Sequence, residues 1–238
     1  MVRMQITEKL LRILPGPSRT KVFCVGYNKT GTTTIEAVLR NLGYRMPGQA
    51  RQEALVVEET FRGNFVPLRT LCSSYDAFQD MPFSQGVIYA IVDSMFPGSK
   101  FILTVRDSNE WFESLVRFQL GGILKKAGVE SLEEFGEQTF KDKAIYLHPN
   151  YLQNVVQRHA VSVVDYEIHY DWSLVYNKEH RIEIYERRNR EIIEYFQDRQ
   201  DQLLVLDVTR EKDNSAIVEF LGLPGEFIGD LPHLNRSQ

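Results

Sequence analysis

Apolar residues along the chain form short continuous runs separated by segments with helical spacing. Runs of the length of buried strands lie at residues 22–25, 100–105 and 203–207, and a segment rich in aromatic residues at 75–83 suits a further short strand. Between the runs, apolar positions recur every three or four residues, as on one face of a helix. This alternation predicts an α/β protein with a central parallel sheet flanked by helices.

The helical segments can be bounded from their spacing and from capping residues. They are expected at residues 35–42 with Gly43 as C-terminal cap, 54–61, 87–95 capped by Ser84, a segment capped by Ser108, 178–200, and a last segment from Asp213 or Asn214 to 221. On the long helix, Asn189 falls on the apolar stripe and needs a hydrogen-bond partner if it is buried. Residues 46–74 are weakly patterned, and residues 64–71 have no clear period.

Residues 121–171 contain no clear strand pattern and one short helical pattern at residues 132–139. We interpret this segment as a cover over the substrate side of the sheet. The 238 residues, 43% hydrophobic and 25% charged, otherwise fit one globular domain over residues 1–238, with residues 1–20 as an N-terminal extension.

Charge and cysteine content narrow the class of protein. A net charge of −4 argues against nucleic acid as a partner, because nucleic acid requires a basic surface. Cys24 and Cys72 have no ligand-like spacing and indicate free thiols in a reducing compartment. Without a signal-peptide core or a long uncharged apolar run, we expect a cytoplasmic protein with no membrane contact.

The segment after the first predicted strand has the composition of an anion-binding loop. Residues 26–31 read Gly-Tyr-Asn-Lys-Thr-Gly, which has the GxxxxG spacing of a P-loop, and we call them the anion loop. Thr32 stands where a P-loop has its lysine, and the only cation in the loop is Lys29. Glycines let a phosphate approach the backbone, and the helix that follows directs its N–H groups at the anion. The expected anion-binding residues are Asn28, Lys29, Thr30, Gly31, Thr32, Thr33 and Thr34.

Two further strands end in residues with suitable chemistry. Asp80 follows the aromatic run and Arg106 follows the run at residues 100–105. Because parallel strands present their carboxyl ends at one edge, we expect both beside the anion loop. Ser114, eight positions after Arg106, would add a hydroxyl to that guanidinium and hold a second phosphate.

Together these motifs resemble the sulfotransferases that use 3′-phosphoadenosine 5′-phosphosulfate. Lys29 to Thr33 resemble their 5′-phosphosulfate loop, and Arg106 with Ser114 resembles their 3′-phosphate site. Asp80 and Pro82 match an Asp-x-Pro of the bacterial, plant and fungal branch, as do Pro232, His233 and Asn235 at the end of the chain. The resemblance implies a P-loop NTPase-like sulfotransferase fold and transfer of a sulfuryl group to a hydroxyl or amine of a small molecule, with adenosine 3′,5′-bisphosphate as product.

In this interpretation, Lys29 and Asp80 are the catalytic residues and no metal takes part. A sulfuryl group carries less negative charge than a phosphoryl group, so one lysine with backbone N–H groups suffices. Asp80 would accept the proton of the attacking hydroxyl. Asp80 could instead cap a helix or pair with a lysine, and His148, His159 or His169 could be the base.

Two other functions stay open from the sequence. A P-loop kinase would use ATP with Mg²⁺ held by Thr33, and the missing lysine at position 32 argues against it. A catalytically silent nucleotide-binding protein would keep the anion loop without an acceptor site, which the presence of Lys29 and Asp80 disfavours.

Overall fold

The computed structural model describes residues 20–232 of the chain. These residues form two compact units: unit 1 contains residues 20–106 and 188–232, and unit 2 contains residues 107–187. The first 19 residues of the predicted extension, and His233 and Asn235 of the predicted C-terminal motif, lie outside the described residues.

Unit 1 is built on a four-stranded parallel sheet, as the apolar runs predict. Its strands lie in the order β2-β1-β3-β6 and all pair in parallel. Their bounds are Val22–Cys24 for β1, Ala77–Phe78 for β2, Lys100–Thr104 for β3 and Leu203–Leu206 for β6. The carboxyl ends of all four strands therefore meet at one edge.

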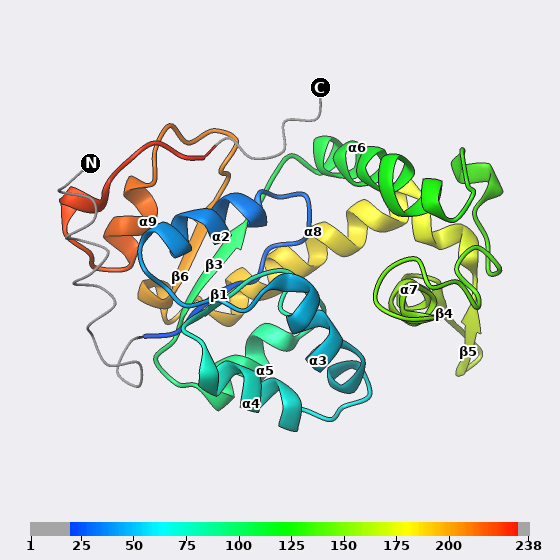
Figure 1. Cartoon of the computed structure of the whole chain (residues 1–238), viewed down its shortest axis with the longest axis horizontal. Coiled ribbons are helices and arrows are strands. Elements are labelled where there is room, and N and C mark those ends of the chain that lie inside the picture. The colour runs from blue at the N-terminus through cyan, green and yellow to red at the C-terminus, as the bar shows by residue number, and fades with distance from the viewer. Residues whose placement is uncertain (1–19, 233–238) are drawn as a thin grey trace. The chain divides into compact units, whose positions relative to one another are not determined.

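Helices cover both faces of this sheet (Figure 1). One face carries α2 (Thr32–Asn41) and α9 (Ser215–Phe220), and the other carries α3 (Gln49–Phe61), α4 (Val66–Ser74) and α5 (Ile88–Met95). Phe23 of β1 packs into the core on the α5 side, while Val22 and Cys24 pack on the α2 side. This alternation is what the period of two in a strand requires. The predicted fold class, a parallel sheet between helices, is confirmed.

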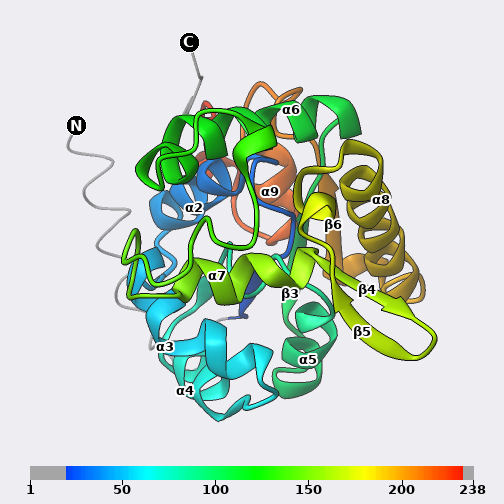
Figure 2. The same cartoon turned by 90° about the vertical axis from the view of Figure 1, so that its right-hand side faces the viewer.

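Unit 2 is mainly helical and contains one hairpin (Figure 2). It contains α6 (Ser108–Gln119), α7 (Tyr151–Val156) and the antiparallel strands β4 (Val161–Val164) and β5 (Glu167–Tyr170). The helix α8 (Lys178–Tyr195) begins in unit 2 and ends in unit 1.

Three capping or helix predictions are wrong in detail. Ser84 does not cap α5, because residues 80–87 form turns in which the Ser84 N–H donates to the Asp80 carbonyl, and α5 begins at Ile88. Asp107, not Ser108, caps α6, since its carboxylate accepts the N–H groups of residues 109 and 110. The helix expected at residues 132–139 is a single 3-10 turn, Leu132–Glu134.

The sequence pattern also missed two helices, one hairpin and two buried residues of the long helix. Residues 66–74 form α4, residues 151–156 form α7 and residues 161–170 form the hairpin, and the pattern located none of them. On α8 Tyr185 and Ile192 are buried, as the predicted apolar stripe requires, but the other buried residues are Arg181 and Arg188, while Asn189 on the stripe is only half-buried. Among residues 20–232, no helix combines the length and hydropathy that crossing a membrane requires.

Candidate active site

The anion loop joins β1 to α2 and has the backbone geometry of an anion cradle. Lys29 has a φ of 72° and Gly31, the N-cap of α2, has a φ of 95°. Left-handed residues among right-handed ones turn successive N–H groups to one side of the chain. At Lys29, a residue with a side chain, this conformation costs about 1 kcal/mol. Strain of this kind clusters at functional sites.

Two close contacts fix the loop against β3. A Cβ on Gly26 would lie 2.0 Å from the Thr104 hydroxyl and 2.5 Å from the Thr104 carbonyl, so only glycine fits. The Thr30 hydroxyl lies 2.5 Å from the Tyr27 carbonyl, to which it donates, and 2.6 Å from the Thr104 hydroxyl. The Thr30 hydroxyl is thus engaged with Tyr27 and Thr104. Of the predicted anion-binding groups of Thr30, this leaves its backbone N–H.

The first turn of α2 continues the cradle. Thr32 and Thr34 are buried and Thr33 is exposed. The first N–H groups of a helix have no acceptor within the helix, and the helix dipole adds partial positive charge there. No acidic residue occupies this first turn. The N-terminus of α2 is therefore electrostatically suited to an anion.

Asp80 lies two residues beyond the end of β2, at the same edge of the sheet as the anion loop. Its carboxylate accepts a hydrogen bond from the Asn28 amide at 3.1 Å and another from the Gln49 amide at 2.8 Å. The Asn28 contact joins the anion loop directly to the carboxylate. Asp80 has a φ of 58°, so a second strained residue stands at this edge.

The surroundings of Asp80 make it a weaker acid than an ordinary aspartate. Burial, and secondarily the charge of Glu53, raise the pKa of Asp80 to about 7, while the Met81 N–H and the Gln49 amide oppose the shift. Gln49 also donates to Glu53 at 2.9 Å, so one amide bridges two carboxylates. A carboxylate with a pKa near neutrality can accept a proton in a reaction.

Gln49 and Glu53 were not among the residues singled out from the sequence. They are four positions apart at the start of α3, in a segment whose pattern is weak. The one signal available was the pairing of an amide and a carboxylate at helical spacing, and such a pair is common on solvated helix faces.

The two residues expected to bind a second phosphate lie in different units. Arg106 follows β3 by two residues, at the edge that carries the anion loop, and is partly exposed. Ser114 lies on α6 in unit 2 and is 9% exposed. Their joint role stays a prediction.

The three candidate histidines, His148, His159 and His169, and Trp111 belong to unit 2. His159 is half-buried, and loss of solvent around its ring, together with nearby Arg181 and Arg158, holds its pKa well below the usual range. Trp111 is buried and stacks on Tyr185 with ring centres 4.3 Å apart, as expected for a core residue. Within residues 20–232, no three His, Cys, Asp or Glu side chains come together as a metal site would need.

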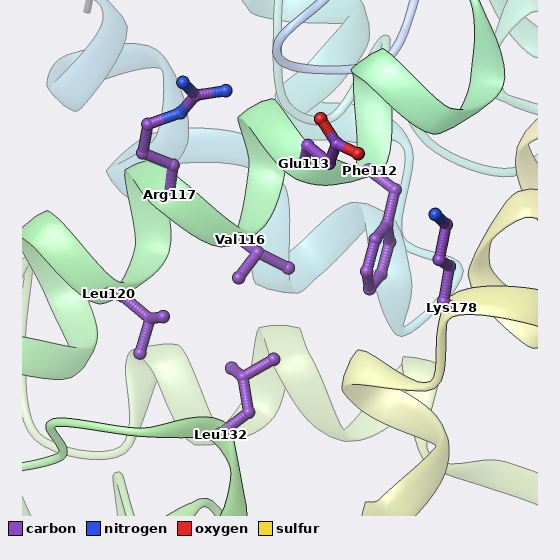
Figure 3. A pocket seen from close by; sticks show the side chains of 7 residues that line it. All are labelled: Phe112, Glu113, Val116, Arg117, Leu120, Leu132 and Lys178. Carbon is purple, nitrogen blue, oxygen red and sulfur yellow. The ribbon is translucent and has the colours of Figure 1, made fainter. Parts of the chain in front are cut away.

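Unit 2 also has a hollow of about 600 Å³ beside α6 (Figure 3). Apolar side chains of Phe112, Val116, Leu120 and Leu132 face it, and Glu113, Arg117 and Lys178 complete its lining.

Comparison with known proteins gives one result. The family model described as "Sulfotransferase domain" matches residues 21–238, which is nearly the whole chain. No curated protein matches the chain. The match includes every residue of the candidate site and leaves out residues 1–20.

Proposed function

Because the chain belongs to the sulfotransferase domain family, we propose that it transfers a sulfuryl group from 3′-phosphoadenosine 5′-phosphosulfate to a hydroxyl or amine of a small molecule. One observation carries the proposal: Asn28 of the anion loop donates to Asp80, a carboxylate with a pKa of about 7. A base and an anion cradle in direct contact are what the transfer of an anionic group to a protonated nucleophile requires.

The anion loop fits the 5′ end of the donor. Its glycine at position 26 lies against β3, its left-handed residues turn N–H groups to one side, and α2 begins directly after it. Lys29 is the single cation of the loop, and Thr32 and Thr33 add hydroxyls in the first turn of α2. When bound, the donor supplies an activated sulfuryl group whose negative charge these groups balance.

Asp80 is the base in this proposal. Above pH 7 its carboxylate is charged and can take the proton of an acceptor hydroxyl, whose oxygen then forms the new bond to sulfur. The bond from sulfur to the bridging oxygen breaks, and its electron pair leaves with adenosine 3′,5′-bisphosphate. Lys29 stabilises the charge that grows on that oxygen. Asn28 and Gln49 orient the carboxylate.

We infer that the reaction needs no metal. The group in transfer carries one negative charge less than a phosphoryl group, so the cradle and Lys29 can balance it without Mg²⁺. Arg106 and Ser114 would hold the 3′-phosphate of the donor. The free thiols Cys24 and Cys72 favour a cytoplasmic setting, and the net charge of −4 favours a small acceptor over a nucleic acid.

Calorimetry tests the donor assignment. The wild-type protein should bind adenosine 3′,5′-bisphosphate without metal, and binding should be unchanged by EDTA. Tight binding of ATP with Mg²⁺ and none of the bisphosphate would show a kinase-type site instead. Consumption of the phosphosulfate donor, first with water and then with phenols, alcohols and amines as acceptors, separates an enzyme from a silent binding protein.

A second measurement tests the 3′-phosphate assignment. Arg106→Ala should weaken the bisphosphate by about 10- to 100-fold, the contribution of one charge-assisted contact. Adenosine 5′-monophosphate lacks the 3′ group, so its affinity should change by less than about threefold. Equal losses for the two nucleotides would remove Arg106 from this role.

A further inference from the structure

Arg188 is a buried cation on the face of α8 that packs in unit 1. Arg188 and Ile192 lie four residues apart on this face, Phe196 directly after the helix continues the spacing, and all three are buried. Ile192 and Phe196 belong to the core below the sheet, where Phe196 packs on Phe101 with ring centres 4.7 Å apart. The position of Arg188 is therefore set by a well-packed helix.

The three nitrogen atoms of the Arg188 guanidinium donate to three backbone carbonyls. Nη1 donates to Val25 at 2.7 Å, Nη2 to Phe83 at 3.1 Å and Nε to Gly86 at 3.0 Å. Val25 is the residue directly before the anion loop, whereas Phe83 and Gly86 belong to the turns of residues 80–87 that follow Asp80. One side chain thus connects the residue that precedes the anion loop to the segment that carries the proposed base.

Burial of this charge is unfavourable, which the pKa of Arg188 reflects: it is lowered, chiefly by burial. The rings of Tyr27 and Tyr89 lie 5.1 Å and 5.9 Å from the guanidinium carbon and offset part of the cost. An apolar side chain of similar size would fill the space without burying a charge. What an apolar side chain cannot do is fix three carbonyls of two separate segments in one plane.

We propose that Arg188 is a positioning residue that sets the separation between the anion loop and Asp80 for sulfuryl transfer. The inference rests on the proposed function. The main influences on the pKa of Asp80 are burial, the charges of Glu53 and Glu36, and hydrogen bonds from Met81 and Gln49. Arg188 donates to backbone carbonyls and not to the Asp80 carboxylate, so we expect it to act on the geometry of the site and not on the titration of Asp80.

The effect of losing this brace should appear in turnover and not in nucleotide affinity. Arg188→Lys keeps the charge but loses the planar fork, so it cannot hold three carbonyls at once. The anion loop still follows β1 and the turns of residues 80–87 still follow β2, so both segments should still form. A misplacement of about 1 Å between reacting groups lowers a rate about 100-fold. We expect donor consumption with water as acceptor to fall 10- to 100-fold, with the bisphosphate affinity within about threefold of wild type and an unchanged pH midpoint near 7.

Arg199→Met is the matched control. Arg199 follows the same helix and bonds to the buried Asp93 at 2.8 Å, in contact with neither loop. It should lower the melting temperature as much as Arg188→Lys or more, with turnover per folded molecule unchanged. The folded fraction of each variant is counted from the stoichiometry of bisphosphate binding, so that lost protein is not read as lost rate.

The outcomes are distinct. A wild-type protein that neither binds the bisphosphate nor consumes the donor contradicts the proposed function itself. The positioning role is wrong if the wild type does both and Arg188→Lys turns over within threefold of it. It is also wrong if a shift in the pH midpoint of Arg188→Lys accounts for the whole loss of its rate. Should Arg188→Lys not fold, Tyr89→Leu removes one supporting ring and leaves the hydrogen bonds; turnover should fall severalfold at unchanged affinity, and unchanged turnover would overturn the inference.

Discussion

Replacement of Asp80 by asparagine should change both the stability and the activity of the protein in a pH-dependent way. The native pKa of Asp80 is about 7, against an ordinary value of 3.8. This difference of about three pH units corresponds to about 4 kcal/mol by which the folded state disfavours the charged carboxylate. Because the native state holds the proton more tightly than the unfolded state, the contribution of Asp80 to wild-type stability falls as pH rises from about 4 to about 7 and is level above that.

Asparagine does not titrate, so Asp80→Asn removes this loss. Its own cost, a changed hydrogen-bond arrangement with Asn28 and Gln49, is the same at every pH. The difference in unfolding free energy between variant and wild type should therefore shift by up to about 4 kcal/mol in favour of the variant between pH 4 and pH 8. Urea unfolding at four or five pH values measures it, and the constant cost cancels in the comparison.

Activity should move in the opposite direction. Wild-type donor consumption should fall about tenfold for each pH unit below 7, because only the charged carboxylate is a base. Asp80→Asn should lower turnover at least about 100-fold and abolish this pH dependence. Asp93→Asn, a buried carboxylate bonded to Arg199 and Tyr195, is the control and should keep turnover. Parallel stability curves for wild type and Asp80→Asn, together with an active variant, would refute the reasoning.

Three other predictions concern the anion loop and the thiols. Gly26→Ala should destabilise the protein by about 1–3 kcal/mol and abolish bisphosphate binding in calorimetry, while Gly48→Ala, where a Cβ meets nothing within 4 Å, should do neither. Lys29→Ala should lower donor consumption about 100-fold or more and the bisphosphate affinity far less; equal losses would make Lys29 a binding residue only. Burial raises the pKa of Cys24 to about 12 and that of Cys72 further, so a thiol reagent at pH 8 should label neither until urea is added, and rapid labelling of the native protein would contradict the buried positions.

The sheet could be predicted because its strands are buried on both faces. Continuous apolar runs of this kind, such as the one at residues 100–105, can be recognised in the sequence alone. The helix α4 could not, since its sequence has a proline in the first turn and only three of its nine residues are buried. The hairpin escaped because its side chains, including Val163 and Ile168, are largely exposed, so no alternation against a core marks it.

The anion loop and Asp80 could be predicted from the sequence, but the charged residues packed around them, Arg188 and Glu53, could not. Charged residues read as surface residues, and so Arg188 was passed over in favour of Asn189, whose Oδ1 atom is buried without a hydrogen-bond partner among the described residues. Glu53 was missed for the same reason. In both cases burial of a charge depends on contacts with segments more than 25 residues away, which no local pattern contains.

The contact of Gly26 and Thr30 with Thr104 has a consequence for protein engineering. A segment copied from this chain into another parallel sheet would carry the anion loop without Thr104, the residue that the loop packs against, because Thr104 lies 74 positions after Thr30. The transplantable part is the loop together with the end of the neighbouring strand. For the same reason, substitutions at Gly26 and Thr104 should be non-additive in double-mutant tests, and natural variation at one position should constrain the other.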